Sequence, residues 1–183
     1  MTALWASACV LALTLLVTCC FVLVSAERLS DAAGADIYEA VDCSFLSGES
    51  NSWKYLTDYI SPGGDVVIDK SVNAIASGAF NGTRLGEMGV KIDSVYIPDS
   101  VKIIDSRAFY ATSAEETRLS GDIEYIGSNA FANSQSLKKV YFDKKPDHHI
   151  EFAPDAFAGS ENIEFVNFPD DVVISEDNMI SYK

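Results

Sequence analysis

Residues 66–80 read Val-Val-Ile-Asp-Lys-Ser-Val-Asn-Ala-Ile-Ala-Ser-Gly-Ala-Phe, and a closely similar stretch recurs 29 positions later as residues 95–109. A more degenerate copy ends at Ala130-Phe131, and a fourth ends at Ala156-Phe157. A repeat of about 20 to 30 residues is typical of a solenoid, in which each coil buries its apolar face against its neighbours. The repeat therefore predicts a solenoid, an architecture whose usual function is binding at an extended surface.

Each repeat divides into parts that together predict one coil. Val95-Tyr96-Ile97 alternates in polarity and is rich in β-branched and aromatic residues, which indicates a short strand with one buried face. Pro98-Asp99-Ser100 predicts a turn, because proline fixes φ and aspartate or serine bonds the local backbone. A second short apolar stretch follows, and Ser-x-Ala-Phe closes the coil as a single helical turn with its Phe pointing inward.

Two insertions and the C-terminal end interrupt this regularity. The four Ala-Phe pairs are spaced by 29, 22 and 26 positions, and extra loops around residues 86–89 and at residues 144–149 explain the spread. Insertions in solenoids collect on loops of one face, often the binding face. After Phe168 no further Ala-Phe pair occurs, and the polar residues 175–178 predict a terminal cap.

The segment before the first repeat predicts a cover for the first coil. Residues 27–36 predict a flexible spacer, and Trp53, Leu56, Tyr59 and Ile60 recur at helical spacing, which predicts one short amphipathic helix. A solenoid needs its terminal core covered. The predicted domains are therefore a leader (1–26), a spacer and N-terminal cap (27–64), the solenoid (65–174) and a C-terminal cap or tail (175–183).

The leader carries no charged side chain and predicts a secretory signal peptide. Its apolar run ends in Val24-Ser25-Ala26, whose small residues fit a cleavage site. The run is also long enough to span a bilayer, so an uncleaved N-terminal membrane anchor is an alternative, and a lipid anchor at Cys19 or Cys20 is a third. We expect a secreted or cell-surface protein, or one anchored by an N-terminal transmembrane segment.

Charge and cysteine usage narrow the classes of partner. The net charge of −14 lies entirely after the leader, and such acidity disfavours nucleic acid and anionic membrane surfaces. Cys43 is the only cysteine after the leader, so an intramolecular disulfide cannot form there. Cys43 is either a buried small hydrophobe or, in a secreted protein, the link of a disulfide-bonded dimer.

The repeat resembles the BspA-like leucine-rich repeats of bacterial and protist cell-surface antigens. The resemblance is carried by Ile126-Gly127-Ser128-Asn129-Ala130-Phe131 with Leu137, Val140 and Phe142, and by Ile97-Pro98-Asp99-Ser100-Val101. It implies a β-rich α/β fold, a right-handed leucine-rich-repeat solenoid with short strands on one face and single helical turns on the other. It also implies surface exposure and a role in adhesion or recognition. The residues after each Phe depart from the family's usual Gly-Cys.

Groups that catalyse reactions or bind metals are sparse. The only histidines, His148 and His149, are adjacent and would point to opposite faces of a strand, and no G-x-S-x-G motif occurs. The segment 147–151 lacks a recognised metal-ligand spacing, and the acidic residues between 170 and 177 lack the glycine of a calcium loop. The sequence therefore predicts neither an enzyme nor a metal or other cofactor.

Candidate binding residues fall into two groups. The outward strand positions are expected to form a row with aromatic anchors, above an inward stack of core residues. The row comprises Tyr96, Lys139, Tyr141 and Asn167, and the stack comprises Ile68, Ile97, Leu119, Phe142 and Phe168. The second group is Lys144, Lys145, His148 and His149 in the inserted loop. With Lys138 and Lys139, the loop lysines reverse the local charge, which indicates either a docking patch for an acidic partner or an ordinary solvated edge.

The sequence also predicts one modification site and two alternative functions. Asn81 begins the sequon Asn81-Gly82-Thr83 and is a candidate for N-glycosylation. We expect a protein-binding or adhesion module whose partner is a protein, with membrane contact only through the N-terminal segment. The alternative is a structural or self-associating surface component without a dedicated ligand, which an exposed apolar patch on the terminal coil would favour.

Overall fold

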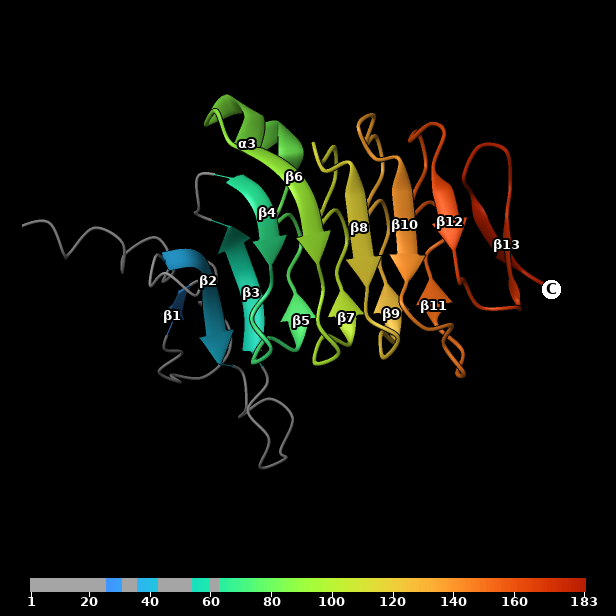
Figure 1. Cartoon of the computed structure of the whole chain (residues 1–183), viewed down its shortest axis with the longest axis horizontal. Helices are drawn as coiled ribbons and strands as arrows, with labels where there is room; N and C mark the ends of the chain where they lie inside the picture. The colour runs from blue at the N-terminus through green and yellow to red at the C-terminus, as the bar shows by residue number, and fades with distance from the viewer. Residues whose placement is uncertain (1–25, 31–35, 43–53, 60–62) are drawn as a thin grey trace, which may run out of the picture.

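The chain winds into a β-solenoid with one short helix in its described part (Figure 1). The computed structural model describes residues 26–30, 36–42, 54–59 and 63–183, so the leader up to residue 25 and Cys43 lie outside the described residues. The solenoid predicted from the repeat is confirmed. Within the described ranges, no helix is both long and apolar enough to cross a membrane.

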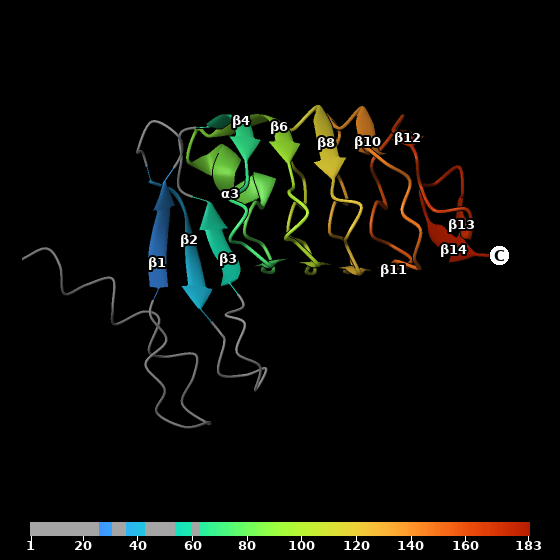
Figure 2. The ribbon, with the colours of Figure 1, turned by 60° about the horizontal axis from the view of Figure 1, so that its bottom comes forward.

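Five parallel strands form one face of the solenoid. Because they are longer than the two-residue strands of the opposite face, we call this face the long-strand sheet. Their order in the sheet follows the chain, so each coil adds one strand beside the strand of the coil before it (Figures 1 and 2). The strands are β4 (Gly63–Val67), β6 (Lys91–Tyr96), β8 (Glu116–Leu119), β10 (Lys139–Phe142) and β12 (Glu164–Val166).

The opposite face is a second sheet built from two-residue strands, which we call the short-strand sheet. It contains β5 (Ala74–Ile75), β7 (Ile103–Ile104), β9 (Tyr125–Ile126) and β11 (Glu151–Phe152) in parallel. Towards the N-terminus the same sheet continues through β3 (Lys54–Tyr59), β2 (Asp36–Asp42) and β1 (Ala26–Ser30). At the other end, β13 (Val172–Ile174) and β14 (Ile180–Tyr182) form an antiparallel hairpin.

The Ser-x-Ala-Phe turns stack into a ladder of aromatic rings between the two sheets. The rings of Phe80, Phe109, Phe131 and Phe157 follow one another at centroid distances of 4.7, 5.0 and 5.2 Å, and neighbouring rings are within 11° of parallel. All four side chains are completely buried. Such offset stacking adds about 0.5–1.5 kcal/mol per pair beyond the burial of apolar area. The ladder therefore ties each coil to the next through the centre of the molecule.

Backbone hydrogen bonds run beside the rings. The amides of Phe80, Phe109 and Phe131 donate to the carbonyl of the alanine before the next Phe, at N to O distances of 2.7, 2.7 and 2.8 Å. Because alanine carries only a methyl group, adjacent turns come close enough for this bond to form. The small alanine of each Ala-Phe pair thus allows adjacent coils to approach closely.

The predicted inward positions form a second stack under the long-strand sheet. Ile68, Ile97, Leu119 and Phe142 are all at most 2% exposed, which confirms four of the five core positions. Phe168 is half-buried and lies edge-on to Phe142, with a distance of 5.1 Å between ring centroids. The core therefore continues past the last regular strand.

The helix predicted around residues 53–60 is wrong, because this segment forms the strand β3. Leu56 and Tyr59 both face the core although they are three residues apart, a spacing that imitates a helix. In the pairing of β2 with β3, Leu56 lies opposite Ala40 and Asp58 opposite Glu39, so Thr57 is the extra residue of a β-bulge. The Tyr59 ring then packs against Phe80 at a tilt of 34°, with 5.0 Å between ring centroids, and continues the ladder. Trp53 and Ile60 lie outside the described residues.

Two further segments differ from the expectations. Residues 27–30 and 36, within the predicted spacer, belong to β1 and β2, which pair antiparallel. The insertion after Phe80 contains the helix α3 (Gly82–Glu87) rather than only a loop. The Asn81 side chain caps it by accepting from the amides of Thr83 and Arg84 at 3.0 and 3.3 Å.

The C-terminal hairpin supplies the last coil with groups that a further coil would otherwise provide. The Tyr182 hydroxyl donates to the Ile150 carbonyl at 2.9 Å and accepts from the Phe152 amide. The Asn178 side-chain amide donates to the Ser160 carbonyl. These bonds satisfy backbone groups at the end of the solenoid, so the hairpin closes it.

The ladder predicts a large difference between two neighbouring substitutions. Phe109→Ala is expected to lower the free energy of unfolding by about 3–5 kcal/mol, because it leaves a cavity between two stacked rings. Tyr110→Ala, on the half-buried next residue, is expected to lower it by less than about 1 kcal/mol. Urea unfolding followed by circular dichroism measures both. Equal losses would contradict the ladder as the main tie between coils.

Candidate functional site

The register of the long-strand sheet sets ten outward side chains into two rows. Val66, Val95, Thr117 and Val140 are buried, so the residues on either side of each face outward. Strand pairing then defines a charged row and, two residues further along each strand, a tyrosine row. The charged row is Asp65, Ser94, Glu116, Lys139 and Glu164, and the tyrosine row is Val67, Tyr96, Arg118, Tyr141 and Val166.

Arg118 lies at the centre of the tyrosine row and fixes its neighbours. Its guanidinium carbon is 4.0 Å from the centroid of the Tyr96 ring, and the group forms an ion pair with Asp143. The hydrogen bond between Arg118 and Asp143 raises the pKa of the guanidinium and lowers the pKa of the carboxyl. Tyr96 is therefore held in place from one side and remains 37% exposed.

Tyr141 is fixed by the charged row. Partial burial raises the pKa of its phenol, and the nearby Glu116 carboxylate, which is hydrogen-bonded to it, raises the pKa further. The Lys139 ammonium lies 4.9 Å from the centroid of the Tyr141 ring. Two tyrosines and an arginine thus form an ordered, partly exposed surface across β6, β8 and β10.

The structure places only part of the predicted row as expected. Tyr96 and Tyr141 share one row, whereas Lys139 lies in the adjacent charged row. Asn167 lies in neither row, because Val166 is the residue opposite Tyr141. Asn167 has a φ of 59°, and its side-chain amide donates to the Phe142 carbonyl at 2.9 Å. This left-handed residue, which asparagine tolerates, breaks the alternation and returns Phe168 to the core.

Sequence reasoning missed Arg118 although a signal was present. Leu119 was predicted to point inward, so the preceding residue had to point outward. The third coil carries no proline turn and matches the repeat poorly. The position of Arg118 beside Tyr96 and Tyr141 therefore emerges only from the pairing of the strands.

The inserted loop of lysines and histidines lies against the C-terminal hairpin rather than beside the two rows. Lys145 forms an ion pair with Asp170, and the distance from His149 Nδ1 to Asp171 Oδ2 is 2.7 Å. His148 Nε2 lies 2.8 Å from the Ile123 carbonyl oxygen. Lys144 is exposed. A binding role for Lys144, Lys145, His148 and His149 stays a prediction, as does glycosylation of the helix cap Asn81.

Comparison with known proteins settles the family. A family model, described as BspA type leucine rich repeat region, matches residues 62–183 in six copies. The chain belongs to the BspA-type leucine-rich-repeat family. The resemblance drawn from the Ala-Phe and Pro-x-Ser motifs is confirmed, and the family model counts six copies where the motifs mark four complete coils and one partial coil. The curated proteins contain no match to the chain.

Two solved structures are similar to this BspA-type chain. One is the crystal structure of the pneumococcal vaccine antigen PcpA, with 17% identity and a TM-score of 0.46, covering 86% of this chain and 54% of that one. The other is a leucine rich cell surface protein from Faecalibacterium prausnitzii, with 10% identity and a TM-score of 0.32, covering 86% of this chain and 58% of that one. The chain thus spans a little over half the length of these proteins.

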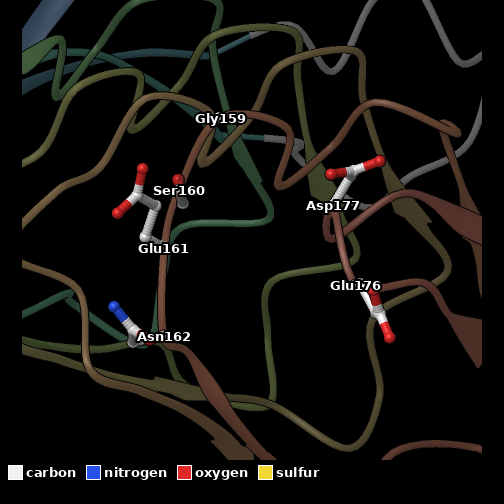
Figure 3. A pocket seen from close by; sticks show the side chains of 6 residues that line it. All are labelled: Gly159, Ser160, Glu161, Asn162, Glu176 and Asp177. Atoms are coloured by element: carbon white, nitrogen blue, oxygen red, sulfur yellow. The ribbon is translucent and has the colours of Figure 1, made fainter.

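The end of the BspA-type solenoid also carries a hollow of about 370 Å³, lined by Gly159, Ser160, Glu161, Asn162, Glu176 and Asp177. Figure 3 shows Glu161 and Asn162 on one side and Glu176 and Asp177 on the other. The Ser160 hydroxyl donates to the Phe131 carbonyl at 2.9 Å, so it is engaged within the core. Among the described residues, no group of three His, Cys, Asp or Glu side chains is placed to hold a metal ion.

The contact between Glu116 and Tyr141 predicts a measurable titration. In Glu116→Gln the pKa of the Tyr141 phenol is expected to fall towards its ordinary value of about 10, because the carboxylate that disfavours the phenolate is gone. The remaining rise comes from burial and from the Asp143 carboxylate. Asp65→Asn, in the same row but two strands away, is the control and leaves this pKa unchanged. NMR of ring-labelled tyrosine follows the titration, and an unchanged Tyr141 pKa in Glu116→Gln would contradict the described contact.

Proposed function

We propose that the chain is a secreted or cell-surface binding module whose protein partner docks on the outward face of the long-strand sheet. The observation that carries the proposal is the tyrosine row, where Tyr96 and Tyr141 flank Arg118 on three adjacent strands. Tyrosine and arginine are among the residues that contribute most to binding energy at protein interfaces. The proposal is of a binding protein and not of an enzyme.

The restrained side chains of the tyrosine row favour this face, rather than the inserted loop, as the binding site. Arg118 contacts Tyr96 and Asp143, and Tyr141 contacts Glu116 and Lys139, so these side chains are already restrained before a partner arrives. Restrained side chains lose less conformational entropy on binding, which leaves more of the contact energy as affinity. In the loop, Lys145 and His149 hold their polar groups against Asp170 and Asp171, and a partner that used these groups would have to displace those contacts.

Secretion is part of the same proposal. It is supported by the uncharged apolar run before Glu27, of which residues 1–25 lie outside the described part of the chain. The N-terminal residue of the native product, determined together with its presence in medium or membrane fraction, decides between a cleaved leader and an anchor. A disulfide-linked dimer through Cys43 would require the same exported state.

A second candidate function is self-association as a surface component. The observation that favours it is exposed apolar surface on the terminal hairpin, where Val173 is 40% and Met179 is 38% exposed. Such a patch is small for a stable interface, and the net charge of −14 opposes contact between copies. The tyrosine row is therefore the better supported site.

The proposal predicts that binding depends on one face of the solenoid. Binding proteins are first selected from a displayed library against the wild-type chain. We expect them to bind the Tyr141→Ala variant at least about tenfold more weakly, because an aromatic side chain at the centre of an interface contributes much of the binding energy. Tyr125→Ala is the matched control, because Tyr125 is also half-buried but faces outward on the short-strand sheet. Surface plasmon resonance measures both. Selected binders that tolerate both Tyr96→Ala and Tyr141→Ala would contradict the proposal.

A further inference from the structure

Carboxylates and tyrosines alternate strand by strand across the long-strand sheet. Asp65 lies on β4, Tyr96 on β6, Glu116 on β8, Tyr141 on β10 and Glu164 on β12, with the carboxylates in the charged row and the tyrosines in the tyrosine row. The repeating unit of this pattern is therefore two strands. Each unit presents one carboxylate and one aromatic ring, in rows separated by two residues along the strand.

The strand spacing converts this pattern into a length. Neighbouring strands lie about 4.8 Å apart, so like groups repeat every 9.6 Å or so across the strands. From Asp65 to Glu164 the three carboxylates therefore span about 19 Å, and the two rows are separated by about 7 Å along the strands. A ligand that uses all three carboxylates needs cationic groups at the same interval.

One regular peptide conformation matches that interval. A polyproline II helix has three residues per turn and rises about 3.1 Å per residue, which gives a repeat of about 9.3 Å. Over two repeats it differs from the carboxylate spacing by only about 0.6 Å. Two turns of α-helix span about 10.8 Å, and two residues of a β-strand about 6.8 Å, so both lose register across the sheet.

We propose that this face binds a polyproline II segment with lysine or arginine at every third residue and proline between them. This inference rests on the proposed function, because it names the partner of the same face. The cationic residues pair with Asp65, Glu116 and Glu164, and the prolines pack on Tyr96 and Tyr141. Aromatic-lined surfaces recognise proline-rich segments in this way, and the preformed helix loses little entropy on binding.

Charge on the face agrees with a cationic partner. The Glu164 carboxylate is exposed and forms no hydrogen bond or ion pair among the described residues, and the Asp65 carboxylate is exposed and accepts only from the Ser94 hydroxyl, at 2.6 Å. Glu116 is half-buried and contacts Tyr141. The Arg118 charge is balanced by Asp143. Two of the three carboxylates can therefore pair with incoming cations without losing an internal ion pair.

The nearby lysines do not make the face fit an acidic partner. Lys138 forms an ion pair with Glu115 at 2.6 Å, and Lys145 forms one with Asp170. Lys139 lies between Glu116 and Glu164 in the charged row, and its ammonium is placed over the Tyr141 ring. Lys139 is thus the one cation of the charged row. It lies between the two carboxylates with which incoming lysines pair, and over the ring on which a proline packs, so it competes with the ligand for both.

Synthetic peptides test this assignment. The probe is a fluorescent nine-residue peptide of three Pro-Pro-Lys repeats, and the control peptide has the same composition with six prolines followed by three lysines. Fluorescence anisotropy measures binding to the full chain. We expect the periodic peptide to bind at least about fivefold more tightly than the control, because only it presents lysines at the carboxylate interval.

Variants of the chain test the individual contacts. Glu116→Gln and Tyr141→Ala are expected to weaken binding of the periodic peptide about three- to tenfold, and Lys139→Met to strengthen it about threefold by removing a competing charge. Glu124→Gln, an exposed carboxylate next to β9 on the short-strand sheet, is the control and leaves binding unchanged. A gain of affinity in Lys139→Met cannot arise from partial unfolding.

The outcomes separate this inference from the proposed function. Equal binding of the two peptides, or no binding of either, would overturn the polyproline inference. Loss of binding in Glu124→Gln as large as in Glu116→Gln would do the same, because the contact would then be charge alone. The proposed function is decided separately, by whether library-selected proteins depend on Tyr141. If selected proteins depend on Tyr141 but contain no proline repeat, the proposed function is supported although the polyproline inference is not.

Discussion

The stacking of one aromatic ring per coil is the interaction on which the rest of the structure depends. Phe80, Phe109, Phe131 and Phe157 form a continuous buried ladder, and the amide beside each of the first three donates to the next coil. Because rings at about 5 Å match the spacing of parallel strands, one ladder sets the rise of both sheets. The ladder ends in Tyr59 at one side and meets Phe165 and Phe168 edge-on at the other.

Function follows from the register that this ladder imposes. Once coils advance by one strand spacing, outward residues of successive strands align, and Tyr96, Arg118 and Tyr141 become neighbours although more than 20 positions separate them in sequence. The same alignment alternates carboxylates with tyrosines. The insertions leave this register intact, because α3 and the loop at residues 144–149 lie outside the strands of both sheets.

The repeat was enough to predict the solenoid, its buried core and two of the residues in the tyrosine row, because period and polarity alternation are encoded locally. Three features could not be predicted from the repeat, for physical reasons. The bulge at Thr57 gives Leu56 and Tyr59 a helix-like spacing in a strand, and the left-handed Asn167 shifts one residue out of alternation. Arg118 lies in a coil whose turn lacks proline, so only the register with its neighbours identifies its place.

Amide hydrogen exchange tests the role of the ladder most directly. The amides of Phe80, Phe109 and Phe131 donate across coils at 2.7–2.8 Å and lie beside fully buried rings. If the ladder holds the coils together, these amides exchange only with global unfolding, as slowly as the slowest amides of the long-strand sheet. Exchange of the three phenylalanine amides through local openings, while the Ile97 amide and its sheet neighbours stay protected, would contradict the account.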